Sequence, residues 1–122
     1  MTSSELVTIE LTADERHLLS RGLAEWGGSA SPDDELARVM GFLSVEDLLA
    51  GHGRELRAAM ESARPLTKSD WRRVLLATEI VFASAVVGAG WDWRYTTGLS
   101  DEDTIRLLRA VQGKVSHGLR SG

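Results

Sequence analysis

Apolar residues recur along most of the chain at the three- and four-residue spacing that is typical of amphipathic helices. Helix starts are marked by a Ser or Thr that is followed by an acidic residue three positions later, the pattern of an N-terminal capping box. Five sites carry this pattern, namely Thr12 with Glu15, Ser31 with Asp34, Ser44 with Asp47, Thr67 with Asp70, and Ser100 with Asp103. The pattern therefore predicts a mainly α, single-domain bundle of about five helices that spans residues 1–122.

The third predicted helix contains two glycines, Gly51 and Gly53, which flank His52. Apolar residues nevertheless fall on one arc of a helix on both sides of these glycines, from Val45 to Ala63. We therefore expect one continuous helix through the glycines. Each glycine lowers the stability of such a helix by about 1 kcal/mol relative to alanine, so we expect this helix to be locally less stable than the others.

The predicted centre of the bundle is a buried helix over about residues 68–88. Between residues 74 and 87 this segment is apolar nearly all round. Its narrow polar stripe consists of Arg73, Ala77 and Ser84. The run is too short for a membrane span and holds Glu79 in its middle, so we expect neighbouring helices to cover it.

Two segments alternate between apolar and polar residues with the period of a β-strand, residues 5–11 and residues 91–97. The first predicts an N-terminal strand-like arm, and the two together are candidates for a small two-stranded ribbon. A lone strand is unstable in water. If the two segments do not pair, the first is therefore expected to pair across a homodimer or to lie as an extended arm.

The composition narrows the function classes. The chain has a net charge of −4 and contains no cysteine. The absence of cysteine excludes disulfide scaffolds, thiolate zinc sites, iron–sulfur proteins and thiol enzymes. Residues 1–64 carry 12 acids and 6 bases, whereas residues 65–122 carry 6 acids and 8 bases, so an acidic N-terminal half precedes a mildly basic remainder. No secretory signal pattern opens the chain, so we expect an acidic cytoplasmic protein.

Two titratable residues occupy apolar helix faces. We interpret His52 either as an imidazole that is hydrogen-bonded at a helix crossing or as a catalytic base. Glu79 is expected to meet Arg94, Arg106 or an indole N–H, because a buried charge is seldom left unpaired; the alternative is a general acid or base. For both residues the structural interpretation is favoured over the catalytic one.

Motifs for metal and cofactor chemistry are missing from the sequence. His17, His52 and His117 lie in different predicted helices and give no converging ligand set, so we expect no metal. Gly88 and Gly90 follow an apolar run but lack the rest of a dinucleotide fingerprint, so we interpret them as a helix end and expect no cofactor. No nucleophile motif of the G-x-S-x-G kind is present, so we predict no catalytic residues.

Residues 35–50 resemble a helix-turn-helix in outline, with a short turn between two predicted helices. In that motif the second helix presents its N-terminal residues to the major groove and needs donors for phosphate. Here those positions hold Glu46 and Asp47. Repulsion from phosphate disfavours DNA binding, and an ordinary helical hairpin is the favoured interpretation.

The densest unusual feature is the segment Trp91, Asp92, Trp93, Arg94 and Tyr95, which follows a glycine pair. Trp, Tyr and Arg are enriched at the hot spots of protein interfaces, so these five residues are the candidate binding site. The alternative is that both tryptophans cover the helical core and only Arg94 and Tyr95 are exposed. Further arginines that could extend a basic surface are Arg72, Arg73, Arg106 and Arg109.

Together these features favour a non-enzymatic protein–protein interaction module, such as a small regulator, an accessory subunit or an immunity or antitoxin-like partner. We expect it to bind another protein through the aromatic and arginine segment and the acidic N-terminal half. One alternative is a small-molecule-binding protein or an enzyme with a pocket around Glu79 and residues 91–95, assisted by His52 or Asp92. A DNA-binding regulator is the third.

Overall fold

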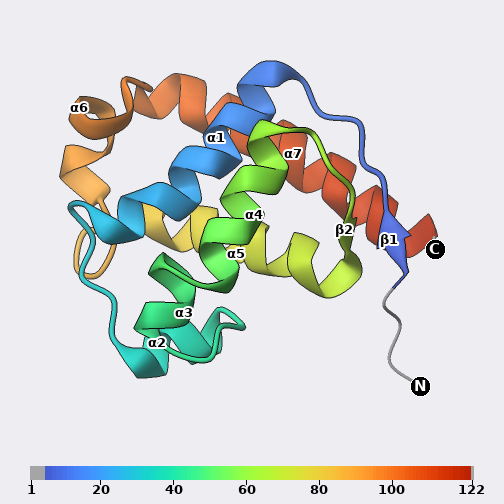
Figure 1. Cartoon of the computed structure of the whole chain (residues 1–122). Coiled ribbons are helices and arrows are strands. Elements are labelled where there is room, and N and C mark those ends of the chain that lie inside the picture. The colour runs from blue at the N-terminus through green and yellow to red at the C-terminus, as the bar shows by residue number, and fades with distance from the viewer. Residues whose placement is uncertain (1–4, 122) are drawn as a thin grey trace.

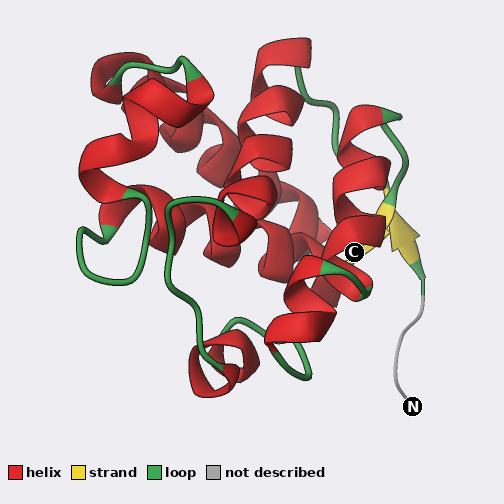
Figure 2. Ribbon diagram, turned by 60° about the vertical axis from the view of Figure 1, so that its left-hand side comes forward, coloured by secondary structure: helices red, strands yellow, loops and turns green. Residues whose placement is uncertain are grey.

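The structure is a computed structural model that describes residues 5–121, so residues 1–4 and 122 of the predicted domain lie outside the described residues. Most of the described residues lie in helices, and two short strands lie at one edge of the domain (Figures 1 and 2). The elements are β1 (Leu6–Val7), α1 (Ala13–Ala24), η1 (Glu25–Gly27), α2 (Asp34–Val39), α3 (Val45–Leu49), α4 (His52–Glu61), β2 (Leu66–Thr67), α5 (Lys68–Ala83), η2 (Gly90–Asp92), α6 (Trp93–Thr97) and α7 (Asp101–Ser121). The prediction of a mainly α, single-domain fold is confirmed.

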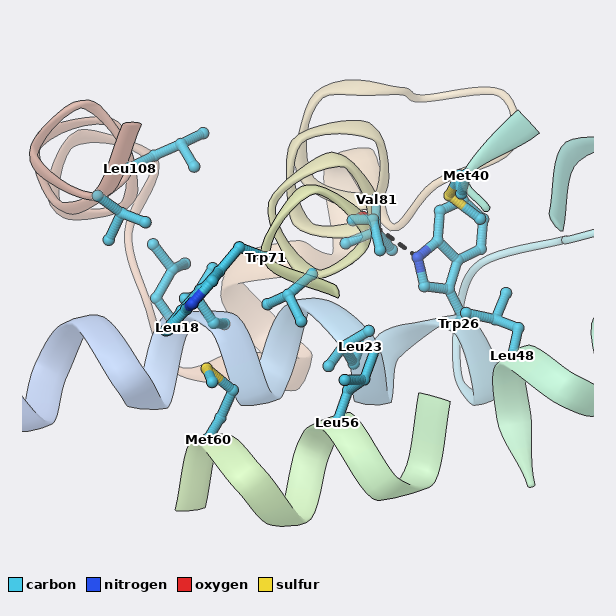
Figure 3. Close-up of a cluster of buried hydrophobic side chains, with 14 of the residues drawn as sticks. Leu18, Leu23, Trp26, Met40, Leu48, Leu56, Met60, Trp71, Val81 and Leu108 are labelled. Carbon is cyan, nitrogen blue, oxygen red and sulfur yellow. Dashed lines mark hydrogen bonds between the residues drawn. The ribbon is translucent and has the colours of Figure 1, made fainter. Parts of the chain in front are cut away.

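The core forms where α1 and α5 cross, with α4 and α7 packed beside them (Figure 3). Helix α4 lies alongside α1 in the opposite direction, so that Met60 faces Leu18 and Leu56 faces Leu23. The helices α1 and α5 approach closely because α1 has a glycine at the crossing. A Cβ on Gly22 would lie 2.1 Å from the hydroxyl oxygen of Thr78, which is fully buried.

Three of the four tryptophans fasten one segment to another through their indole N–H groups. Trp26 donates to the carbonyl of Ala77 at 3.2 Å, and Trp71 donates to the carbonyl of Val7 at 2.9 Å. Both rings are buried, so each combines a large apolar contact with a satisfied donor. The third, Trp93, belongs to the candidate site and is described below.

The helix caps follow the sequence at four of the five predicted positions. The side chains of Thr12, Ser44, Thr67 and Ser100 each accept the backbone N–H of the acidic residue three positions later. The prediction for the second helix was wrong by two residues, because Asp33 rather than Ser31 caps α2 and accepts the N–H of Leu36. Local hydrogen bonding therefore sets most of the helix starts.

The continuous helix expected between residues 45 and 63 is wrong, because the chain breaks between α3 and α4. At the break, the carboxylate of Asp47 accepts the backbone N–H groups of Leu43 and His52 at 3.0 and 3.1 Å. These two bonds lower the pKa of Asp47 below its ordinary value. The turn also brings Gly53 so close to α3 that a Cβ there would lie 1.8 Å from the carbonyl oxygen of Leu48. The glycine thus permits a sharp turn that a side chain would block.

The predicted ribbon between residues 5–11 and 91–97 is also wrong. Strand β1 pairs antiparallel with β2 of the same chain, with Leu6 opposite Thr67 and Val7 opposite Leu66. Residues 91–97 are helical instead, in η2 and α6. A strand would place Trp91, Trp93 and Tyr95 on one face, whereas the helical turn places Trp91 and Tyr95 on the exposed side and Trp93 on the buried side.

The central helix α5 ends at Ala83, earlier than the expected residue 88. Its C-cap residue, Ser84, leaves the helical region, and its hydroxyl accepts the N–H groups of Val86 and Val87. Ala77, expected on a polar stripe, is fully buried against α1 and the Trp26 indole. Within residues 5–121, no helix has the length and apolar character needed to cross a membrane.

Candidate functional site

The segment predicted to bind a partner lies in η2 and α6, at the end of the domain opposite the β1–β2 sheet (Figure 1). The Trp91 and Tyr95 side chains are 86% and 80% exposed, whereas Trp93 between them is completely buried. Asp92 and Arg94 are exposed. Four of the five predicted residues therefore face solvent, and the alternative in which both tryptophans cover the core holds only for Trp93.

Trp93 holds this segment in place. Its indole N–H donates to the hydroxyl of Thr104 on α7 at 2.8 Å, and its ring packs edge-on against Phe82 of α5 at a centroid distance of 5.5 Å. The Thr104 hydroxyl in turn donates to the carbonyl of Ser100. A fully buried Trp93 cannot contact a partner, so its role is to dock α6 against α5 and α7.

Beside this anchor, Arg94 and Tyr95 interact on the outer face of α6. The guanidinium carbon of Arg94 lies 5.6 Å from the centre of the Tyr95 ring, within the range of a cation–π contact. Arg94 forms no ion pair with any residue in the described part of the chain, so its charge remains available. Gly98, with φ of +78°, ends α6 in the left-handed conformation.

Two adjoining hollows lie next to these side chains. One, of about 340 Å³, is lined mainly by the end of α5, the following loop and η2, with Phe82, Trp91 and Arg94 among its walls. The other, of about 300 Å³, lies between α5 and α7 and includes Glu79, Ile105 and Arg109. Both hollows share Phe82 and Ala83, so they adjoin along α5, and we refer to the pair as the depression.

We call this region the aromatic surface. It consists of four residues that line the hollows, Phe82, Trp91, Arg94 and Ile105, and of the exposed Val86 and Tyr95, which are close to them in the sequence. Val86 is 87% exposed, and about half of the Ile105 side chain is exposed. Sequence reasoning did not identify Phe82, Val86 or Ile105 as candidate site residues. No local signal separates them from core residues, because their exposure depends on where α5 ends and how α7 packs.

Glu79 lies at the rim of the second hollow and is partly exposed. Its carboxylate accepts a hydrogen bond from the side-chain amide of Gln112 at 2.7 Å, and the amide oxygen of Gln112 accepts one from Arg109 at 2.9 Å. The expected partners were Arg94, Arg106 or an indole N–H, and that expectation is wrong, because the chain from Glu79 leads through Gln112 to Arg109. The Arg106 guanidinium pairs with Asp103 instead.

His52 is the first residue of α4, and its side chain is partly exposed instead of buried on an apolar face. Its Nε2 lies 2.8 Å from a carboxylate oxygen of Asp70, and the same oxygen accepts from Arg73 at 2.9 Å. The ring stands edge-on to Phe42. Asp70 and Glu79 are nine residues apart on α5, about 13 Å along its axis, so the structure does not bring His52 and Glu79 together.

The other candidate sites are separate. The segment that resembled a helix-turn-helix forms α2 and α3, but α3 has only five residues and carries Glu46 and Asp47 in its first turn. Among residues 5–121, no group of three or more histidine or acidic side chains is placed to hold a metal ion. His17 and His117 are exposed on α1 and α7.

We found no significant match to this chain among protein-family models, curated protein sequences or solved structures.

Proposed function

We propose that the protein is a non-enzymatic interaction module that binds another protein through the aromatic surface. One observation carries this proposal: the three most exposed large apolar side chains within residues 5–121 are Val86, Trp91 and Tyr95, which lie within ten residues of one another. Clusters of exposed apolar side chains are typical of interaction sites, and Trp, Tyr and Arg supply most hot spots.

The support beneath these side chains favours binding. Trp93 is buried between α5 and α7, so the short helix that carries Arg94 and Tyr95 is held before a partner arrives. A surface that is ordered in advance loses less conformational entropy on association. Both exposed aromatic residues also have few rotatable bonds, which lowers the cost of fixing them in an interface.

The chemistry of the surface indicates what the partner presents. The apolar floor of the depression, formed by Phe82, Ala83 and Ile105, fits a row of apolar side chains. Arg94 lines the first hollow together with Asp101 but forms no ion pair with it, so its guanidinium fits a carboxylate of the partner, with which it can form charge-assisted hydrogen bonds. A partner segment with apolar side chains next to an acidic residue is therefore the expected occupant. A regulator, an accessory subunit or an immunity-type protein binds its partner through a surface of this kind.

A small-molecule ligand in the same depression is the competing function. Ligand sites bury most of the surface of the bound molecule. Here Trp91 lines the first hollow but is 86% exposed, and the equally exposed Val86 and Tyr95 line neither hollow, which favours a protein partner. The Glu79 carboxylate is engaged by Gln112, so its hydrogen bond serves to link α5 to α7.

The proposal is tested by affinity capture from the source organism with three tagged forms of the protein. These are the wild type, Trp91→Ala combined with Tyr95→Ala, and Leu43→Ala, which removes a large side chain that is 79% exposed but lies outside the aromatic surface. The captured protein is then purified and its Kd is measured for each form. Trp93→Ala is unsuitable because it removes a buried anchor.

We expect the wild type and Leu43→Ala to bind the same protein with Kd values within about twofold of each other. The double variant should bind at least about tenfold more weakly, because each hot-spot truncation commonly costs about 2 kcal/mol or more. Circular dichroism checks that all three forms are folded. Equal affinity of the double variant, or no partner for the wild type, contradicts the proposal.

A further inference from the structure

A separate hollow, of about 410 Å³, lies between α1 and α4 and shares no residue with the aromatic surface. Its walls combine three arginines, Arg16, Arg21 and Arg57, with Ser20 and the buried Met60. The helices run side by side in opposite directions here (Figure 3), so the hollow follows their shared edge. Its volume lies within the range of about 300–1,000 Å³ that is typical of small-molecule sites.

Helical spacing explains why these side chains meet. Arg16 and Ser20 are four residues apart on α1 and therefore share a face, and Arg57 and Glu61 have the same relation on α4. Because α4 lies against α1, both faces border the same hollow. The sequence alone does not reveal this cluster, since about forty residues separate Arg16 from Arg57 and only the antiparallel pairing joins them.

The donors in the hollow are only partly used. Ser20 is 8% exposed, lines the hollow, and makes no hydrogen bond through its hydroxyl to any residue in the range 5–121. Within the same range Arg57 forms neither an ion pair nor a hydrogen bond, and its buried Nε has no partner. Arg16 uses one terminal nitrogen to donate to the carbonyl of Leu11 at 2.7 Å, which leaves the other free.

The charge balance of the hollow is positive. Arg21 is engaged by the buried carboxylate of Glu25, and Glu61 is the one acidic residue in the hollow's walls. Two further guanidinium groups, those of Arg16 and Arg57, have no acidic partner in the described chain. A positive hollow is unusual in a chain of net charge −4, and free guanidinium donors are suited to an oxyanion, which can accept several of them at once.

We propose that this hollow binds a small phosphomonoester. The phosphate oxygens accept hydrogen bonds from Arg16, Arg57 and the Ser20 hydroxyl, and the organic part of the ligand lies against Ala13. Phosphate fits better than carboxylate because it offers more acceptor oxygens and a larger negative charge to three separate donors. A hollow of this volume also has room for more than a phosphate ion.

Isothermal titration calorimetry at constant ionic strength tests the proposal with three probes: phenyl phosphate, inorganic phosphate and benzoate. The variants are Arg57→Gln and Arg16→Gln. The matched control is Arg54→Gln, which removes the same charge from the same helix at an exposed position outside the hollow. Ser20→Ala removes a single oxygen and keeps the test valid if either arginine variant fails to fold, which circular dichroism reports.

We expect phenyl phosphate to bind one site with a Kd below about 1 mM, and each arginine variant in the hollow to weaken it by about tenfold. Ser20→Ala should weaken it about fivefold, and Arg54→Gln should leave it within about twofold. Tighter binding of phenyl phosphate than of inorganic phosphate supports a phosphomonoester, and equal binding makes free phosphate the ligand at the same site. Three outcomes overturn the proposal: no saturable binding up to about 10 mM, benzoate bound as tightly as phenyl phosphate, or an equal loss in Arg54→Gln.

Discussion

Replacing Trp93 and Trp91 separately by alanine should separate the two roles that neighbouring aromatic residues have in this fold. Trp93 is completely buried and Trp91 is 86% exposed. A buried tryptophan removes about 200 Å² from water, which at about 25 cal/mol per Å² stabilises the fold by about 5 kcal/mol. The same change at Trp91 removes a side chain that solvent already surrounds, so the free energy of unfolding should change by less than about 0.5 kcal/mol.

The hydrogen bond of Trp93 adds less than the burial of its ring. After Trp93→Ala, the Thr104 hydroxyl loses the indole N–H but still donates to the carbonyl of Ser100 at 2.7 Å. It is therefore not left without a partner. Trp93→Phe, which keeps a ring against Phe82, should cost about 1–2 kcal/mol, whereas Trp93→Ala should cost about 3–5 kcal/mol.

Urea denaturation followed by circular dichroism measures these differences. With a slope of about 1.5 kcal/mol per M, a loss of about 5 kcal/mol lowers the unfolding midpoint by about 3 M. A domain of this size has a total stability of about 6–18 kcal/mol, so Trp93→Ala removes a large share of it. If Trp91→Ala shifts the midpoint as far as Trp93→Ala, or if neither shifts it, the assignment of anchor and exposed surface is refuted.

Further predictions concern two helix glycines, the ion pair between Glu15 and Lys114, and the backbone hydrogen bonds of Asp47. Gly22→Ala should destabilise the fold by several kcal/mol because its Cβ would meet Thr78 at 2.1 Å, whereas Gly113→Ala, which meets no atom within 4 Å, should stabilise α7 by about 0.5–1 kcal/mol in the same melts. The pKa of Glu15 is lowered although burial acts to raise it, because the Lys114 ammonium at 2.6 Å and the bonds with Thr12 favour the charged form. This carboxylate therefore stabilises the fold above its unfolded pKa, near 4.5, and that stability is lost as the pH falls through the lower folded pKa. Lys114→Met should cost about 1 kcal/mol at pH 7 and less at pH 3; a pH-independent cost in urea titrations contradicts the assignment. Asp47→Asn should weaken the hydrogen bonds that hold the turn between α3 and α4, so the amides of Leu43 and His52 should exchange faster. Unchanged exchange at these two amides would exclude the capping role of Asp47.

The parts of the fold that the sequence predicts correctly depend on local interactions. The caps at Thr12, Ser44, Thr67 and Ser100 each bond to a residue three positions away, so a short stretch of chain determines them. The helical class follows from the same short-range spacing. The break at Gly51–Gly53 is also local, but its signal competes with an apolar arc that continues across it, and the close approach to Leu48 decides the outcome.

The errors and omissions arise from contacts that are distant in the sequence. Strand β1 pairs with β2, about sixty residues away, because the Trp71 indole binds the carbonyl of Val7 and aligns the two segments. No pattern within residues 5–11 specifies that partner. In the candidate site, Trp93 is buried against Thr104 of α7 and Phe82 of α5, which are distant in the sequence, so composition identified the segment but not the orientation of its side chains.

The central claim, that the aromatic surface contacts a protein partner, is tested most directly by position-specific photo-crosslinking in the source organism. A photoreactive phenylalanine derivative replaces Tyr95, which is 80% exposed on α6, or Leu43, which is 79% exposed away from the aromatic surface. We predict that the derivative at position 95 gives one discrete crosslinked product and that the derivative at position 43 does not give it. This product should disappear when Trp91→Ala and Arg94→Ala are added. No product at position 95, or the same product at both positions, contradicts it.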